Sequence, residues 1–133
     1  MNGFAVPANR GRNMDNKYVA VDLDGVIAEY DGWKGEFHIG PPKDGTKEWL
    51  KHLKLLGFDI IIHTCRRNKE TIKEYLENNR LPYDHINENP EQPETAGDDK
   101  IFAHYYIDDR NPHFKGLGPA VKKIEDEELE EVE

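Results

Sequence analysis

Tyr18-Val-Ala-Val-Asp22-Leu-Asp24-Gly25-Val26 is the stretch of sequence that decides the fold. Its first four residues suit a buried β-strand. They lead directly into two aspartates one residue apart and then into glycine, which can turn the chain sharply. In open α/β sheets, ligands bind just beyond the carboxyl ends of the strands. We therefore expect Asp22 and Asp24 to stand at the mouth of such a site.

A carboxylate pair in this position is typical of magnesium-dependent phosphoryl transfer. One carboxylate attacks phosphorus to form an aspartyl phosphate, a hard cation neutralises the phosphate, and the second carboxylate handles the proton. The same residues also occur in calcium loops. An EF-hand loop, however, needs acidic or amide ligands at positions 1, 3 and 5 with glycine at position 6, and Ala20 breaks that register.

The composition is that of one globular domain with a solvated exterior. The chain has 133 residues, of which 36% are hydrophobic and 34% are charged. No apolar run approaches the roughly 18 residues of a membrane helix, and the N-terminus lacks the apolar core of a signal peptide. We therefore expect a cytoplasmic protein with no membrane partner. The single cysteine, Cys65, excludes an intramolecular disulfide and a cysteine-cluster zinc site.

Three regions are expected along the chain. Residues 1–16 are polar and show no periodicity, so they should form a flexible N-terminal leader. Residues 17–123 should form a single domain, and residues 124–133 an acidic C-terminal tail. The tail carries seven acidic residues, and a solvated, frayed segment is favoured there over a docking segment. The net charge of −9 argues against broad attraction to nucleic acid.

Strands and helices are predicted to alternate within the domain. Asp44 or Thr46 can cap the first helix and Asn68 the second. A turn and a small hairpin flap are expected between Gly25 and Gly45. The alternation predicts an α/β fold, a three-layer Rossmann-like parallel sheet wrapped by helices. The strands are expected at roughly residues 17–22, 58–64, 81–86 and 104–107, and the helices at about 46–56, 68–76 and 98–103, followed by a short C-terminal helix.

Polar residues that could form one site follow three of these strands. Two acidic clusters that face each other at a sheet edge repel unless a cation lies between them. A phosphate on that cation would need hydroxyl and backbone donors and a point positive charge. The residues are Asp22 and Asp24 after the first strand, Thr64 after the second, Asp108 and Asp109 after the last, and Lys100 just before it.

The same segments resemble the four motifs of the haloacid dehalogenase-like (HAD) superfamily, specifically its magnesium-dependent phosphatases. The match covers roughly residues 17–112. It comprises Val19-Ala-Val-Asp22-Leu-Asp24-Gly25-Val26, Ile60-Ile-Ile-His-Thr64, Lys100 and Tyr106-Ile-Asp108-Asp109-Arg110. The resemblance implies a HAD-like catalytic domain that binds Mg²⁺ and hydrolyses phosphomonoesters.

The resemblance also implies a role for each matched residue. Asp22 would be the nucleophile and a magnesium ligand. Asp24 would be the general acid and base, and would also offer its backbone carbonyl to the metal. Thr64 would bind the phosphate, and Lys100 would stabilise both the phosphate and the nucleophile.

The remaining candidate residues lie beside these motifs. The resemblance implies that Asp109 meets the metal directly and that Asp108 supports it. Cys65 has no evident activating histidine, so we expect its backbone N–H, rather than its thiol, to help bind phosphate. Arg66 either contacts an anionic group of the substrate or is solvated. Trp33 either contacts the substrate from the flap or packs beneath it.

No space remains between the motifs for a separate cap domain, because the predicted flap, helices and strands already occupy it. Capless members often act on exposed or large phosphorylated substrates. The expected partner is therefore a phosphorylated small molecule or an exposed phosphate on a larger substrate. Two alternatives remain open: a HAD-fold binding or regulatory module with incidental hydrolysis, and a phosphatase for nucleotides or nucleic-acid ends, which the negative net charge disfavours.

Overall fold

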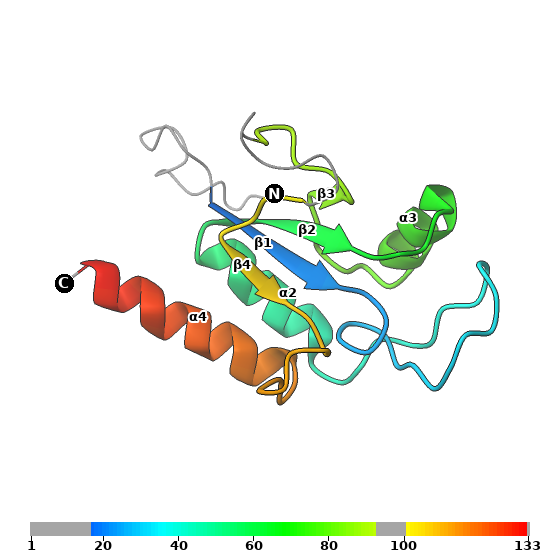
Figure 1. Ribbon diagram of the computed structural model, residues 1–133, viewed down its shortest axis with the longest axis horizontal. Helices are drawn as coiled ribbons and strands as arrows, with labels where there is room; N and C mark the ends of the chain where they lie inside the picture. Colours follow the sequence, from blue (N-terminus) through cyan, green and yellow to red (C-terminus); the bar gives the residue numbers. More distant parts are fainter. Residues whose placement is uncertain (1–16, 93–100, 133) are drawn as a thin grey trace.

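The computed structural model describes residues 17–92 and 101–132. Its centre is a four-stranded, all-parallel sheet in the order β3-β2-β1-β4 (Figure 1). The strands are β1 (Lys17–Asp22), β2 (Phe58–His63), β3 (His85–Ile86) and β4 (Tyr105–Ile107). The predicted α/β fold with a parallel sheet is confirmed. The leader, residues 1–16, and Lys100 lie outside the described residues.

The strand register sets which residues share the carboxyl edge of the sheet. Strand β1 pairs with β2 from Lys17 opposite Phe58 to Asp22 opposite His63. On its other side, Val21 of β1 lies opposite Ile107 of β4. The residues that directly follow β2 and β4 therefore emerge at the same level as the end of β1.

Three helices follow the strands: α2 (Thr46–Leu55), α3 (Lys69–Asn78) and α4 (Leu117–Val132). Asn68 caps α3 as predicted, because its side chain accepts a hydrogen bond from the Thr71 N–H at 3.1 Å. The predicted side-chain cap of α2 by Asp44 or Thr46 is wrong. Gly45 occupies the cap position with φ 80° and no side-chain bond, while the Thr46 hydroxyl donates to the Ile27 carbonyl oxygen at 3.4 Å.

The two faces of the sheet carry different hydrophobic clusters. Val19 and Val21 of β1 belong to the larger cluster, which includes buried residues of all three helices. Tyr18 and Ala20 belong to a smaller one with Ile61 and Ala103, and it contains no helical residue. Within residues 17–92 and 101–132, the helices therefore pack on the face that carries the larger cluster.

The segment over the second face is not a helix. Its backbone N–H groups donate hydrogen bonds to side chains. The Phe102 N–H donates to the Gln92 Oε1 at 2.9 Å, and the Ala103 N–H donates to the Tyr106 hydroxyl at 3.0 Å. Residues 101–103 are not helical. The prediction of one or two helical turns over residues 98–103 is therefore wrong for 101–103, and residues 98–100 lie outside the described part of the chain.

The third strand is shorter than predicted. Only His85 and Ile86 pair with β2, whereas a strand over residues 81–86 was expected. The Asp84 side chain accepts the Ile60 N–H at 2.8 Å, and its own N–H donates to the Ile60 carbonyl oxygen at 2.9 Å. A side chain thus occupies one ladder position, which ends regular pairing at that point.

The acidic C-terminal segment is helical through Val132, so the short helix and the frayed tail expected there are both incorrect. Ile124 is buried in the main core, about one helical turn after Val121. The Glu128 carboxylate accepts hydrogen bonds from Lys17 Nζ at 2.8 Å and from the Tyr105 hydroxyl at 2.7 Å. These contacts hold the second half of α4 beside β1 and β4 (Figure 1). The proposed boundary at residue 123 stays a prediction.

The connection from β1 to α2 forms the segment expected to be a flap. The Glu29 N–H donates to the Pro41 carbonyl oxygen at 2.8 Å, and an antiparallel bridge joins Ala28 to Pro42. The residues between them contain no strand, so this is a closed loop rather than a regular hairpin, and we call residues 29–41 the flap loop. None of the helices in the described part of the chain has the length and apolar character needed to cross a membrane.

Candidate active site

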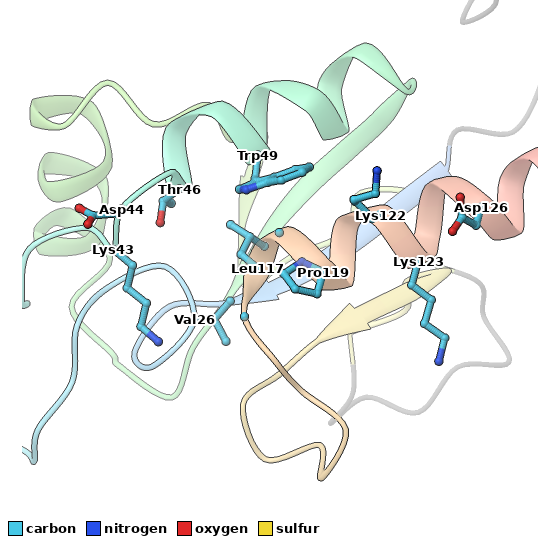
Figure 2. Close-up of a pocket in the computed structure, with 12 residues that line it drawn as sticks. Val26, Lys43, Asp44, Thr46, Trp49, Leu117, Pro119, Lys122, Lys123 and Asp126 are labelled. Carbon is cyan, nitrogen blue, oxygen red and sulfur yellow. The ribbon is translucent and has the colours of Figure 1, made fainter.

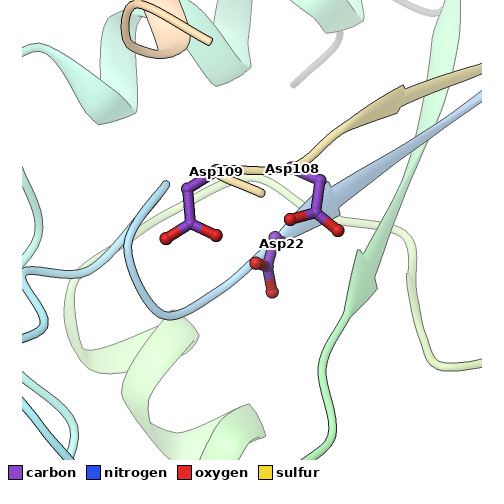
Figure 3. A group of neighbouring side chains, drawn as sticks. All are labelled: Asp22, Asp108 and Asp109. Atoms are coloured by element: carbon purple, nitrogen blue, oxygen red, sulfur yellow. The ribbon is translucent and has the colours of Figure 1, made fainter. Parts of the chain in front are cut away.

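Three aspartates gather at the carboxyl edge of the sheet (Figure 3). Asp22 ends β1, and Asp108 and Asp109 directly follow β4. One carboxylate oxygen from each lies within 4.8 Å of the others. Oxygen donors at this spacing suit a hard divalent cation. The structure therefore brings together three of the four aspartates that the sequence assigned to a metal.

Gly25 makes room for this cluster. Its φ of 88° lies in the left-handed region, and a Cβ built there would come within 2.1 Å of the Asp109 Oδ2. The turn is closed by backbone bonds, among them those from the Ile27 and Ala28 N–H groups to the Leu23 carbonyl oxygen at 3.0 and 2.9 Å. Glycine is thus required both for the turn and for the approach of Asp109.

The electrostatics of the cluster favour a bound cation. Burial, with added repulsion from Asp108 and Asp109, raises the pKa of Asp22 to about 7. Asp108 differs, because hydrogen bonds from Arg110 lower the pKa of its carboxyl. The Arg110 Nη2 donates to Asp108 at 2.8 Å. Arg110 also acts on Asp22, but the pKa of Asp22 stays raised.

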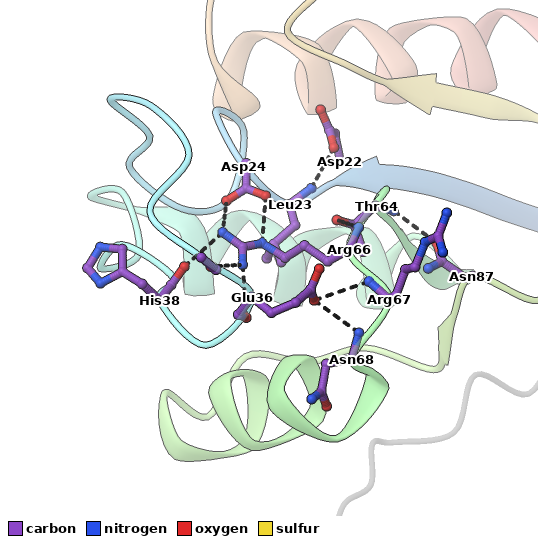
Figure 4. A network of polar contacts seen from close by, with 11 residues as sticks. Asp22, Leu23, Asp24, Glu36, His38, Thr64, Arg66, Arg67, Asn68 and Asn87 are labelled. Atoms are coloured by element: carbon purple, nitrogen blue, oxygen red, sulfur yellow. Dashed lines mark hydrogen bonds and ion pairs between the residues drawn. The ribbon is translucent and has the colours of Figure 1, made fainter.

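Asp24 is held by a different partner, the buried guanidinium of Arg66 (Figure 4). The Arg66 Nε donates to Asp24 Oδ2 at 2.8 Å and its Nη2 donates to Asp24 Oδ1 at 3.0 Å. The Arg66 side chain is 3% exposed, and that of Asp24 is 19% exposed. The solvated role expected as one alternative for Arg66 is wrong, because its side chain is buried. Its assignment as a substrate contact stays a prediction.

Arg66 also ties the flap loop to the site. Its remaining N–H groups donate to the carbonyl oxygens of Gly35, Glu36 and His38. Glu36 reinforces the attachment, since its Oε1 accepts the N–H groups of Arg67 and Asn68 at 3.2 and 3.1 Å (Figure 4). The flap loop is therefore fastened to the segment between β2 and α3.

Trp33 lies against the same guanidinium. The Arg66 Cζ lies 4.8 Å from the centroid of its ring, a cation–π arrangement. The Trp33 side chain remains 57% exposed, so it does not pack beneath the flap loop as one alternative proposed. Its assignment as a substrate contact stays a prediction.

Thr64 and Cys65 occupy the strand end next to Asp22, because His63 lies opposite Asp22 in the register. The Thr64 N–H donates to the Asn87 Oδ1 at 2.9 Å, and its hydroxyl oxygen accepts the Arg66 N–H at 3.1 Å. Cys65 is exposed and carries a free thiol. Both residues line a cavity of about 440 Å³, and their roles in binding phosphate stay predictions.

A larger cavity, of about 760 Å³, lies between α2 and the start of α4 (Figure 2). It is lined by Trp49, Leu117 and several lysines, and none of the four site aspartates borders it. Lys43 connects the two places, because its Nζ donates to the Gly25 carbonyl oxygen at 2.6 Å. We place the chemistry at the carboxylates rather than in this cavity.

Four residues of the site were missed in the sequence. Asn87 has φ 53°, a conformation that asparagine tolerates better than most residues, and its place after the third predicted strand was the one available signal. Glu36 and Lys43 carry no local signal, because their contacts depend on how the flap loop folds back.

Tyr75 packs against the main core with a buried hydroxyl that lacks a hydrogen-bond partner among the described residues. Burial and the nearby Asp24 carboxylate raise the pKa of this hydroxyl.

Comparisons with known proteins add structural relatives. No protein-family model matches the chain, and no curated protein matches it. A solved structure of a conserved protein from Bacteroides thetaiotaomicron is 26% identical, with a TM-score of 0.67, and the match covers 85% of this chain and 93% of that one. The chain has an α/β Rossmann-like fold.

Two further matches are to chains of Pnkp1/Rnl/Hen1 assemblies, one of them described as an RNA repair complex. That one is 23% identical with a TM-score of 0.52, over 72% of this chain and 37% of the other. The second is 21% identical with the same TM-score, over 74% of this chain and 41% of the other. These likenesses support the fold.

Proposed function

We propose that the protein is a magnesium-dependent phosphomonoester hydrolase that works through an aspartyl phosphate on Asp22. The observation that carries the proposal is the approach of Asp22, Asp108 and Asp109 to within 4.8 Å at the end of two parallel strands. The residue-by-residue resemblance to HAD phosphatases supports the same assignment.

The donor set fits Mg²⁺. All three groups are carboxylates, which suit a hard cation. Burial raises the pKa of Asp22, and repulsion from Asp108 and Asp109 adds to the rise; a divalent ion would relieve that repulsion. Asp22, Asp109 and Asp108 would hold the ion, with the Asp24 carbonyl as a further ligand. When bound, Mg²⁺ would neutralise charge on the substrate phosphate.

The chain's own residues would then carry out two displacements. An Asp22 carboxylate oxygen attacks phosphorus, the bond to the leaving oxygen breaks, and Asp24 gives that oxygen a proton. In the second step Asp24 takes a proton from water, the water oxygen attacks phosphorus, and the bond to Asp22 breaks. Inorganic phosphate leaves, and both carboxyl groups return to their starting states. Thr64, the Cys65 N–H and Lys100 would hold the phosphate oxygens.

The test is hydrolysis of p-nitrophenyl phosphate with Mg²⁺ and with excess chelator. Wild-type protein should release p-nitrophenolate only with the metal, and Asp22→Asn should lower kcat by at least about 100-fold. Asp126→Asn, the same chemical change at an exposed position of α4, is the matched control and should retain activity. Metal-independent turnover, or an active Asp22→Asn variant, would overturn the proposal.

The substrate class is open to the same assay. A panel of sugar phosphates, nucleotides and an oligonucleotide phosphorylated at its 5′ or 3′ end separates small-molecule substrates from nucleic-acid ends. Metal binding without hydrolysis of any member would favour the alternative of a binding or regulatory module.

A further inference from the structure

We infer that Arg66 is a positioning residue for proton transfer, because it fixes the Asp24 carboxylate against the flap loop. This inference rests on the proposed function and adds a participant to it. Arg66 would act through Asp24 and would not touch the substrate. Replacing Arg66 should then lower the rate most for substrates whose leaving oxygen needs a proton.

Every donor of the Arg66 side chain is used within the protein. A guanidinium has five N–H groups: one on Nε and two on each Nη. Two go to the two oxygens of Asp24, at 2.8 and 3.0 Å. The other three go to the carbonyl oxygens of Gly35 at 3.3 Å, Glu36 at 3.1 Å and His38 at 2.8 Å. No N–H remains for a substrate phosphate.

Only arginine matches this set of acceptors. The planar fork serves a carboxylate on one edge and backbone carbonyls on the others, whereas a lysine ammonium offers three donors from a single point. The Arg66 side chain is 3% exposed, and the Trp33 ring covers one face of the guanidinium. The orientation of Asp24 is therefore set by a rigid group with little solvent around it.

The pairing leaves Asp24 able to exchange a proton. Each carboxylate oxygen has two lone pairs, and Arg66 occupies one on each. The second lone pair of an oxygen remains free to carry the proton that Asp24 gives to the leaving oxygen and later takes from water. The Asp24 side chain is also 19% exposed, so the site is not sealed. Fixing the carboxylate in this way holds it in the orientation needed for proton transfer and still leaves an oxygen lone pair to bind the proton.

A purely structural strut would give a different result from a positioning residue. A strut that only holds the flap loop would lower the rate for all substrates alike. A residue that aims the proton donor would matter little for p-nitrophenyl phosphate, whose p-nitrophenolate departs readily without a proton. It would matter greatly for an alkyl phosphate such as glycerol phosphate, whose alkoxide does not.

The experiment compares kcat/KM for these two substrates, since this constant reports formation of the aspartyl phosphate. For Arg66→Lys, kcat/KM for glycerol phosphate should fall about 10-fold further than that for p-nitrophenyl phosphate. Arg67→Lys is the matched control and should leave the ratio unchanged, because the neighbouring side chain is exposed and makes no ion pair within the described residues. An equal loss for both substrates would overturn the inference.

A second variant keeps the test decisive if Arg66→Lys does not fold. Arg66→Ala is assayed with millimolar guanidinium ion, and with urea as the uncharged control of the same shape. Guanidinium should restore the glycerol phosphate rate selectively, and urea should not. Rescue by both, or by neither, would count against positioning. A wild-type protein inactive on both substrates would overturn the proposed function itself, and this inference with it.

Discussion

Replacing Asp22 by asparagine should stabilise the metal-free protein. Folding moves this carboxyl from an ordinary pKa of 3.8 to about 7, chiefly by burial and then by repulsion from Asp108 and Asp109. A group whose folded-state pKa is raised keeps its proton in the folded state when the unfolded chain has lost it. Stability is therefore lost as the pH rises from about 4 to 7, and the full cost is present above 7.

The size of the effect follows from the shift. About three pKa units at roughly 1.4 kcal/mol each give an upper limit of about 4 kcal/mol at pH 8. Because Asp22 is only partly buried, solvent screening reduces this to about 2 kcal/mol. For a domain of this length, that corresponds to a rise of roughly 5–10 °C in Tm.

The assay is thermal unfolding followed by circular dichroism in chelator at pH 8 and at pH 4. Asp22→Asn should unfold at a higher temperature than wild type at pH 8 and at nearly the same temperature at pH 4. Added Mg²⁺ should raise the Tm of wild type and raise that of the variant much less. Asp126→Asn should behave as wild type throughout. A variant that is less stable than wild type at pH 8 would refute the reasoning.

Three further substitutions probe the supports of the site. Gly25→Ala should destabilise by about 1–3 kcal/mol and abolish the magnesium-induced rise in Tm, because the new methyl group meets Asp109 and the backbone is left-handed; an unchanged rise would contradict this. Lys43→Met should lower kcat several-fold while magnesium still raises Tm, since only the bond to the Gly25 carbonyl is lost. Glu128→Gln should cost about 1 kcal/mol in urea unfolding, with activity unchanged, because it weakens the contact with Lys17.

The sequence was informative where structure depends on neighbouring residues or on the topology of a parallel sheet. An apolar run followed by Asp22 was enough to place that residue at a strand end. A parallel sheet then places the end of the last strand at the same edge, and the pairing of β1 with β4 in the structure brings Asp108 and Asp109 beside Asp22.

The sequence was uninformative where the burial and the partners of a residue depend on how a distant loop folds back. Arg66 and Arg67 are identical in type and adjacent, yet one is buried and bonded to Asp24 and the other is exposed. The difference comes from carbonyl groups of the flap loop, about thirty positions earlier. The prediction for the acidic end of α4 was wrong for a related reason. Its high charge favoured a solvated segment, but one buried residue, Ile124, holds the segment on the core.

The two aspartates of the opening stretch therefore face opposite electrostatic situations, although a single residue separates them. Asp22 is partly buried among like charges, and Arg110 offsets their repulsion only in part. Asp24 has a permanent cation, Arg66, that binds both of its oxygens. In the mechanism that we propose, the nucleophile Asp22 stands in the first environment and the proton carrier Asp24 in the second. Removing Mg²⁺ should accordingly disturb Asp22 and leave the Asp24–Arg66 pair in place. Replacing Arg66 should disturb Asp24 and leave the environment of Asp22 unchanged.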